Sequence, residues 1–214
     1  MRLNKDSNIL EAADLVLSGM SREESLRQQL AAYGISEEKR QVLSSLYEEA
    51  RTRLSAQQKC YDEQWSLSQQ LKAQMEATQS RFKEHARVVR AAYRNEVDTL
   101  HLLKINRFER DGWPCINQAA YFYSRVQEQD INLQPYGVSR KELEQSRSAV
   151  KTLLGMKKDR SWQKAKAEHC TQEKNAAMKA LREWLVEFRT IARLACKHNP
   201  QMLEMFGIRV LTTA

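Results

Sequence analysis

The chain has 214 residues, a length sufficient for one large domain or two small ones. It contains only 6 glycines and 3 prolines, and the good helix formers Ala, Leu, Glu, Gln, Lys and Arg dominate. Because chain breakers and β-branched residues are both scarce, the composition excludes a fold built on sheets and predicts long α-helices. The net charge of +8 allows an anionic partner without requiring one.

Apolar runs and cysteines bear on the compartment. No run of about 18 apolar residues is present, and the most apolar stretch near the start is interrupted by Glu11 and Asp14. We therefore predict no membrane association and a cytoplasmic location. The cysteines form no CxxC pair and no disulfide framework, so we expect four reduced thiols. They are Cys60, Cys115, Cys170 and Cys196.

Two short helices are predicted at the start of the chain. Ser7 is placed to cap the first, which we expect to end at Gly19. Ser21 followed by Glu24 has the spacing of a capping box, which predicts a second short helix that stops at Gly34.

Two long helices follow, separated by a shorter one. Ser36 is the cap of the first long helix, expected over residues 37–94. After a break at Gly-Trp-Pro, a helix is expected over residues 115–129. Ser139 then opens a second long helix that runs toward His198.

Apolar side chains recur every seven residues along both long helices, which is typical of helices that pack against each other. The pattern predicts an elongated all-α helical bundle with two long antiparallel helices and short end helices. We expect one common core of side chains from both long helices. Its predicted members are Met75, Phe82, Val89, Met178, Leu185, Phe188 and Ile191.

The two halves of the sequence repeat each other with an offset of 103. The segment Tyr33-Gly34-Ile35-Ser36 matches Tyr136-Gly137-Val138-Ser139. When residues 21–105 are set against 124–208, 16 of the 85 positions are identical; chance gives roughly 6–7% for ordinary composition. We predict an internal duplication, with a first unit over residues 1–110 and a second over 111–214. The two would form one pseudo-two-fold globule rather than independent domains.

The end of the second unit carries a distinctive segment. It comprises Leu181-Arg182-Glu183-Trp184, Phe188, Ile191-Ala192-Arg193 and Ala195, followed by Pro200, Leu203, Gly207 and Ile208. This segment resembles the C-terminal LREW…F..IAR.A segment of a family of uncharacterised bacterial all-helical proteins. The resemblance implies a helical fold and a bacterial setting, and it implies no particular chemistry.

Patterns that would indicate a metal or a catalytic group are missing. None of the four histidines has a glutamate three residues before it, as a di-iron bundle requires. Asp98 and His101 have a suitable spacing, but the counterpart of His101 in the second unit is Glu204. His169 and Cys170 are adjacent, so on a helix their side chains diverge. We predict no metal, no cofactor and no catalytic residue.

One helix face is basic. Its members recur at i, i+4, i+7 and i+11, and they are Lys83, Arg87, Arg90 and Arg94. Such a stripe is suited to bind phosphates, although a solvated surface is the favoured reading because half of the stripe is lost in the second unit. Arg90 and its counterpart Arg193 lie between apolar residues. We expect both to be structural, with packed stems and paired guanidinium groups.

The leading hypothesis is a non-enzymatic structural or protein-interaction bundle that binds a protein partner or a second copy of itself. Nucleic-acid binding through the basic stripe is an alternative, not favoured because the excess charge is modest for this length. An enzyme without a recognisable motif is a further alternative. Salt-dependent retention on DNA would favour the first alternative, and a deep polar pocket with clustered ionisable groups would favour the second.

Overall fold

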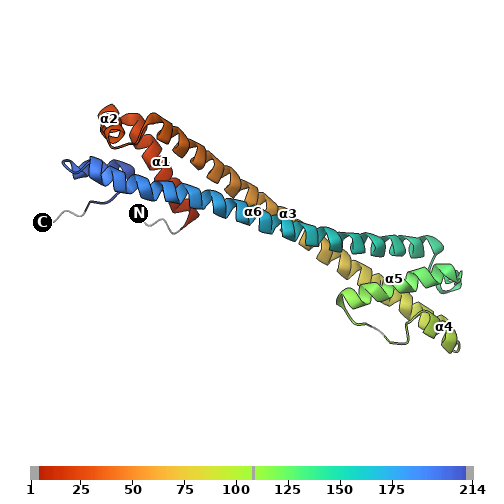
Figure 1. Cartoon of the computed structure of the whole chain (residues 1–214). Helices are drawn as coiled ribbons and strands as arrows, with labels where there is room; N and C mark the ends of the chain where they lie inside the picture. The colour runs from red at the N-terminus through yellow and green to blue at the C-terminus, as the bar shows by residue number, and fades with distance from the viewer. Residues whose placement is uncertain (1–4, 108, 211–214) are drawn as a thin grey trace. The chain divides into compact units, whose positions relative to one another are not determined.

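A computed structural model describes residues 5–107 and 109–210 (Figure 1). Of these described residues, 83% are helical and none is in a strand, which confirms the prediction of an all-α fold. No helix within the described ranges is both long and apolar enough to cross a membrane. The helices are α1 Asp6–Arg22, α2 Glu24–Ala32, α3 Glu37–Ala92, α4 Val97–Leu102, α5 Gly112–Glu128 and α6 Arg140–Ala195, with 3₁₀ helices η1 Gln134–Tyr136 and η2 Pro200–Phe206.

The two long helices α3 and α6 are each 56 residues long. The predicted caps of α3 and α6 are confirmed, because the backbone N–H of Lys39 donates to Ser36 Oγ at 3.4 Å and that of Glu142 donates to Ser139 Oγ at 3.2 Å. The predicted cap of α1 is wrong, because Ser7 lies inside that helix. Helices α3 and α6 end two to three residues before the predicted ends. Their first residues differ by 103 in number, and so do their last.

The turns before α3 and α6 have matching hydrogen bonds. Tyr33 N and Ile35 N donate to Leu30 O at 3.0 and 3.1 Å, and Tyr136 N and Val138 N donate to Leu133 O at 3.0 and 3.2 Å. Each turn requires a left-handed residue, which is supplied by Gly34 at φ +90° and by Gly137 at φ +84°. The two Tyr-Gly turns therefore have one backbone geometry.

The predicted boundary between the first two helices is wrong in detail. Helix α1 continues through Gly19 to Arg22. The hydroxyl of Ser21 donates to Leu17 O at 2.8 Å inside α1, so it does not cap α2 and no capping box forms. Gly19 packs too closely against a neighbouring ring to carry a side chain. A Cβ at this position would lie 2.8 Å from the ring of Phe206.

Gly19→Ala should therefore destabilise the protein, although alanine favours a helix. The new methyl group would overlap a buried ring, and overpacking of this kind costs about 1–3 kcal/mol. Gly155→Ala in α6 is the matched control, since no atom lies within 4 Å of its added Cβ. There the helix propensity alone should act and stabilise by about 0.5–1 kcal/mol. Urea denaturation followed by circular dichroism measures both changes, and an equal gain in both variants would contradict the close packing.

Helix α5 begins earlier than predicted. Gly112, expected to be part of a break, is its first residue. Pro114 is tolerated because it lies in the first turn, where the backbone N–H has no partner within the helix.

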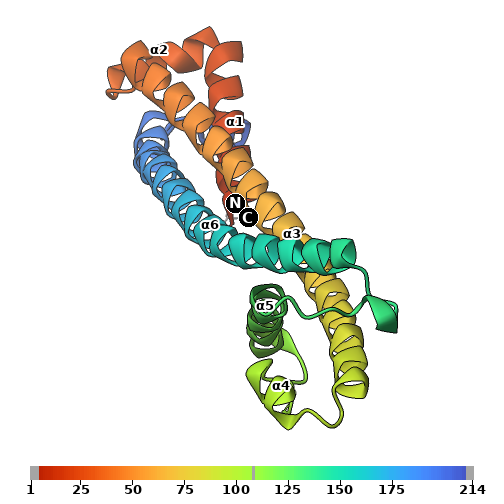
Figure 2. The ribbon, with the colours of Figure 1, turned by 90° about the vertical axis from the view of Figure 1, so that its right-hand side faces the viewer.

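The chain forms two compact units. The first combines the chain up to Tyr61 with the chain from Lys166 onward, and the second comprises Asp62–Ala165. In both views α1 and α2 lie at the start of α3, whereas α4 and α5 lie near its end (Figures 1 and 2). Each compact unit thus takes parts of both predicted sequence units, 1–110 and 111–214. The compact units therefore do not coincide with the predicted sequence units, and the internal repeat stays a prediction.

Each compact unit has its own hydrophobic core, so the prediction of one common core is wrong. Phe82 and Val89 are buried in the second unit, whereas Met178, Leu185 and Phe188 are buried in the first. The remaining predicted members, Met75 and Ile191, are only partly buried. The seven-residue spacing identified buried faces correctly, but it carries no information about which stretch of the partner helix each face meets.

Candidate functional site

The basic stripe lies on α3, and three of its four residues line a cavity. Lys83, Arg87 and Arg90 line a space of about 370 Å³ in the second unit, whereas Arg94 does not. The segment before α5 also lines this space, through Arg110 and Asp111. Four cationic side chains from two segments therefore share one cavity with a single carboxylate. We call this set the basic cavity.

Two of these cations have fixed partners. Lys83 Nζ lies 2.9 Å from Asp111 Oδ1, and the two side chains are 34% and 75% exposed. Arg90 donates from Nε to Ile105 O at 2.8 Å, and its Nη2 donates to the same oxygen. Burial lowers the pKa of Arg90. The prediction of a structural Arg90 with a packed stem and a paired head is thus confirmed.

The same prediction is wrong for Arg193, whose side chain is exposed. The partly buried arginine of this region is Arg189, next to the core residue Phe188. Burial, and to a smaller degree the charge of Arg193, lowers the pKa of Arg189. Apolar neighbours in the sequence did not show which arginine is buried. The core face of α6 contains Phe188 and Ala192, and Arg193 lies outside that face.

The sequence identified three lining residues of the basic cavity and missed two. Arg110 and Asp111 lie about twenty residues beyond the stripe, and only the fold of the connecting segment returns them to α3. Asp111 compensates the charge of Lys83, and the Ile105 carbonyl accepts from Arg90, which offsets part of the repulsion among these cations. Arginine and lysine gathered in this way are suited to bind phosphate or carboxylate groups.

His85 lies in a buried polar cluster of the second unit. It is 1% exposed; its Nδ1 lies 3.0 Å from the hydroxyl of Tyr123, and its Nε2 lies 3.4 Å from Glu142 Oε1. Burial strongly raises the pKa of Tyr123, so this hydroxyl stays protonated. Both ring nitrogens of His85 are engaged, which suits a residue that links α3, α5 and α6. Within the described residues, no group of three or more His, Cys, Asp or Glu side chains is arranged to hold a metal ion.

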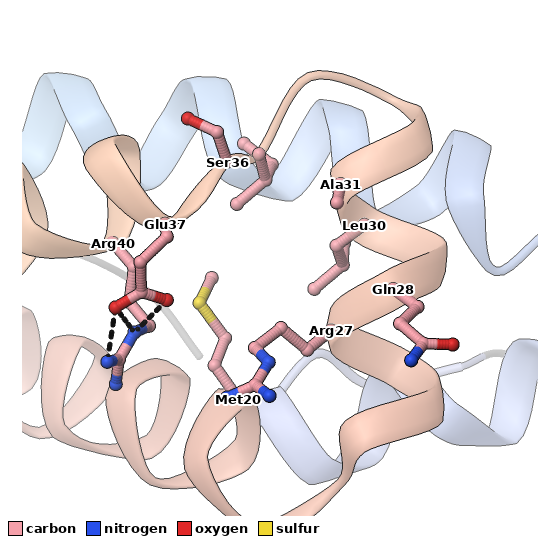
Figure 3. Close-up of a pocket in the computed structure, with 9 residues that line it drawn as sticks. Met20, Arg27, Gln28, Leu30, Ala31, Ser36, Glu37 and Arg40 are labelled. Carbon is pink, nitrogen blue, oxygen red and sulfur yellow. Dashed lines mark hydrogen bonds and ion pairs between the residues drawn. The ribbon is translucent and has the colours of Figure 1, made fainter.

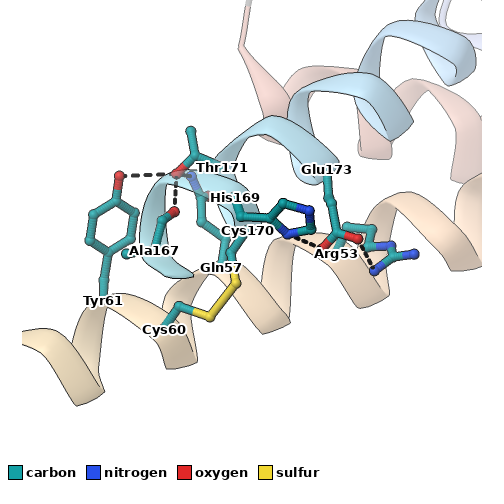
Figure 4. Close-up of a disulfide and its surroundings, with 9 residues drawn as sticks. All are labelled: Arg53, Gln57, Cys60, Tyr61, Ala167, His169, Cys170, Thr171 and Glu173. Carbon is teal, nitrogen blue, oxygen red and sulfur yellow. Dashed lines mark hydrogen bonds and ion pairs between the residues drawn. A yellow bond between two sulfur atoms is a disulfide. The ribbon is translucent and has the colours of Figure 1, made fainter. Parts of the chain in front are cut away.

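Two of the four cysteines are paired, which overturns the prediction of four reduced thiols. Cys60 in α3 and Cys170 in α6 form a disulfide with a Cα–Cα distance of 6.9 Å (Figure 4). Spacing rules missed it because the partners lie 110 residues apart and only helix packing brings them together. Cys115 and Cys196 are free, as expected. Both are buried, and burial raises the pKa of both thiols.

A polar cluster surrounds the disulfide (Figure 4). Thr171 Oγ1 donates to Ala167 O at 2.9 Å, and it lies 3.1 Å from both Gln57 Nε2 and Tyr61 Oη. A hydroxyl has one proton to donate, so Thr171 must accept from both Gln57 and Tyr61. These bonds fix the register of α3 against α6 beside the disulfide.

The turn before α3 closes a small cavity of about 170 Å³ (Figure 3). Its wall is apolar and its rim is charged, with Arg27 paired to Glu24 and Arg40 paired to Glu37. The hydrogen bond with Glu24 raises the pKa of Arg27, and the charge of Glu37 adds to this more weakly. The lining residues are Met20, Arg27, Gln28, Leu30, Ala31, Ile35, Ser36, Glu37 and Arg40.

A second cavity, of about 250 Å³, lies beside the turn before α6. Five of its lining residues stand 103 positions after lining residues of the first, namely Tyr123, Asp130, Ile131, Arg140 and Leu143. The charges are exchanged: Arg27 and Glu37 correspond to Asp130 and Arg140. The latter two form an ion pair at 2.8 Å.

Comparison of the chain with models of protein families, with curated proteins and with solved structures finds no match.

Proposed function

We propose that the protein is a non-enzymatic helical bundle with a structural or protein-binding role, and that it binds a second copy of itself. The observation that carries this proposal is a pair of exposed tryptophans in the second unit. Trp65 on α3 is 68% exposed and Trp162 on α6 is 64% exposed. Tryptophan is strongly enriched in the energetically dominant parts of protein interfaces. An open groove of about 690 Å³, lined by Trp162 and residues of both helices, lies on the same unit.

We also propose that the long helices are antiparallel and that the chain arose by internal duplication. Within the first unit, rising numbers on α3 meet falling numbers on α6. The pairs are Lys39–Glu187, Arg53–Glu173, Gln57–Thr171 and Cys60–Cys170. The equal lengths of α3 and α6, the matching Tyr-Gly turns and the two corresponding cavities support the duplication with its offset of 103.

The resemblance to bacterial all-helical proteins and the cytoplasmic location also remain proposals. The disulfide weakens the second, because disulfides persist mainly in oxidising compartments. Determining the thiol state of Cys60 and Cys170 in intact cells would decide between the cytoplasm and an oxidising compartment.

Sedimentation equilibrium tests the self-association. We expect the average mass of the wild-type chain to rise above 25.0 kDa as its concentration increases. Changing Trp65 and Trp162 together to serine should weaken association at least tenfold, or about 1.4 kcal/mol.

The matched control changes Tyr33 and Tyr136 to serine, because both are 50% exposed aromatic residues and lie in the turns before α3 and α6. It should leave association unchanged. A wild-type chain that stays monomeric throughout, or equal weakening in both double variants, would contradict self-association through the tryptophans.

A second candidate function is nucleic-acid binding, which the four cations of the basic cavity favour. We expect it to be weak and unspecific, because Lys83 is paired with Asp111 and Arg90 with a backbone carbonyl. A long stripe of solvent-facing cations would be needed to follow a phosphate backbone. An enzyme without a recognisable motif is the third hypothesis. Neither of the two small cavities beside the turns suggests a catalytic pair.

A further inference from the structure

We propose that the basic cavity is a binding site for a compact phosphate-bearing anion, of the size of pyrophosphate or the phosphate chain of a nucleotide. This inference does not depend on self-association of the chain. It concerns Lys83, Arg87 and Arg90 on α3 and Arg110 on the segment before α5. The ligand class follows from the way in which these charges are arranged.

The charges converge on one space instead of following a line. Lys83, Arg87 and Arg90 share a face of α3, and a linear reader of phosphates would continue this face to Arg94. Arg94 is exposed but lies outside the cavity, and the fourth cation, Arg110, comes from the segment before α5. A ligand with clustered negative charge therefore fits this arrangement better than the evenly spaced phosphates of a duplex.

The walls differ in how firmly they are held. Arg90 is anchored by two hydrogen bonds to Ile105 O, which fixes one side of the cavity before any ligand arrives. Arg87 and Arg110 are exposed, so their long side chains are able to close over an anion. The volume of about 370 Å³ lies within the usual range of small-molecule sites, about 300–1,000 Å³.

The charge of Asp111 should affect the affinity of the basic cavity for anions. Its carboxylate is bonded to Lys83 Nζ at 2.9 Å, and both side chains line the cavity. An arriving phosphate would have to replace this carboxylate or lie beside it, and like charges at close range repel. Removing the charge of Asp111 should therefore strengthen anion binding.

Isothermal titration calorimetry on the full chain tests the site. The probes are pyrophosphate, ATP and inorganic phosphate, with duplex DNA as a separate arm. Changing Arg87 and Arg110 together to glutamate should weaken pyrophosphate binding at least tenfold, or about 1.4 kcal/mol. Arg94→Glu is the control: it reverses one charge, half the change of the double variant, on the same helix face but outside the cavity, and it should alter affinity by less than about twofold. Asp111→Asn should bind more tightly than the wild type.

The outcomes separate the alternatives. Tighter binding of ATP than of pyrophosphate would indicate that a base adds contacts, and the reverse order would identify a free phosphate chain as the ligand. Both would support the site. Equal weakening by Arg94→Glu and the cavity variant, with stronger binding of duplex DNA, would replace the site with a linear nucleic-acid stripe. Absence of binding by any probe to the wild-type chain would overturn the proposal. Circular dichroism checks that the variants fold, which their exposed positions favour. None of these results bears on the association through the tryptophans.

Discussion

Phe188→Ala should lower the free energy of unfolding by about 3–5 kcal/mol, the range for loss of a large core aromatic. Phe188 is 1% exposed in the core of the first unit. Its ring stacks on Trp184 with centroids 5.5 Å apart, and Phe206 meets it edge-on at 5.1 Å. Truncation removes both ring contacts and leaves a cavity that helices on several sides hold open.

Urea denaturation followed by circular dichroism measures the loss, with the fluorescence of the tryptophans as a second probe. Trp65→Ala is the control, because it removes a larger aromatic side chain from a position that is 68% exposed. We expect that variant to stay within about 0.5 kcal/mol of the wild type. A loss below about 1 kcal/mol for Phe188→Ala would show that this core is not closed around the ring.

Changing Cys60 and Cys170 to serine should have an effect of similar size. The disulfide links residues 110 apart in sequence, and constraining an unfolded loop of that length contributes about 4–5 kcal/mol in the chain-entropy treatment. Near the disulfide, α3 and α6 are also joined by hydrogen bonds to Thr171 and by the Arg53–Glu173 ion pair, and the first unit has its hydrophobic core in addition.

The measurement is unfolding with and without a thiol reductant. Reductant should destabilise the wild-type chain and leave the double serine variant unchanged, since Cys115 and Cys196 carry no bond to break. Mass spectrometry after alkylation under denaturing conditions should find two protected cysteines. A wild-type chain with four alkylated cysteines and no response to reductant would restore the prediction of reduced thiols.

Local features of the sequence predicted the parts of the fold that depend on neighbouring residues. Ser36 and Ser139 start the long helices because a cap acts within one helical turn, and Gly34 and Gly137 end the preceding segments for the same reason. Ser21 shows the limit of this reasoning. It has the spacing of a cap, yet its hydroxyl donates to Leu17 O, because α1 continues past Gly19 to Arg22 and places Ser21 inside the helix.

Features that depend on contacts between residues far apart in the sequence could not be predicted from local sequence patterns. The disulfide needs α3 and α6 to approach with a particular register, which no spacing rule encodes. The separation into two cores likewise depends on where the short helices cover the long ones. In the basic cavity, the periodicity of α3 placed three cations on one face. Arg110 was missed because its position depends on how the segment before α5 returns to that helix.

The exchanged charges of the two small cavities keep the attraction at each turn although the signs are opposite. Arg27 is attracted by Glu37, and Asp130 pairs with Arg140. Reversing the charge of one member alone would place like charges beside each other, at a cost of about 1 kcal/mol or less for each surface contact. The attraction is therefore retained only when both members of a pair change sign together.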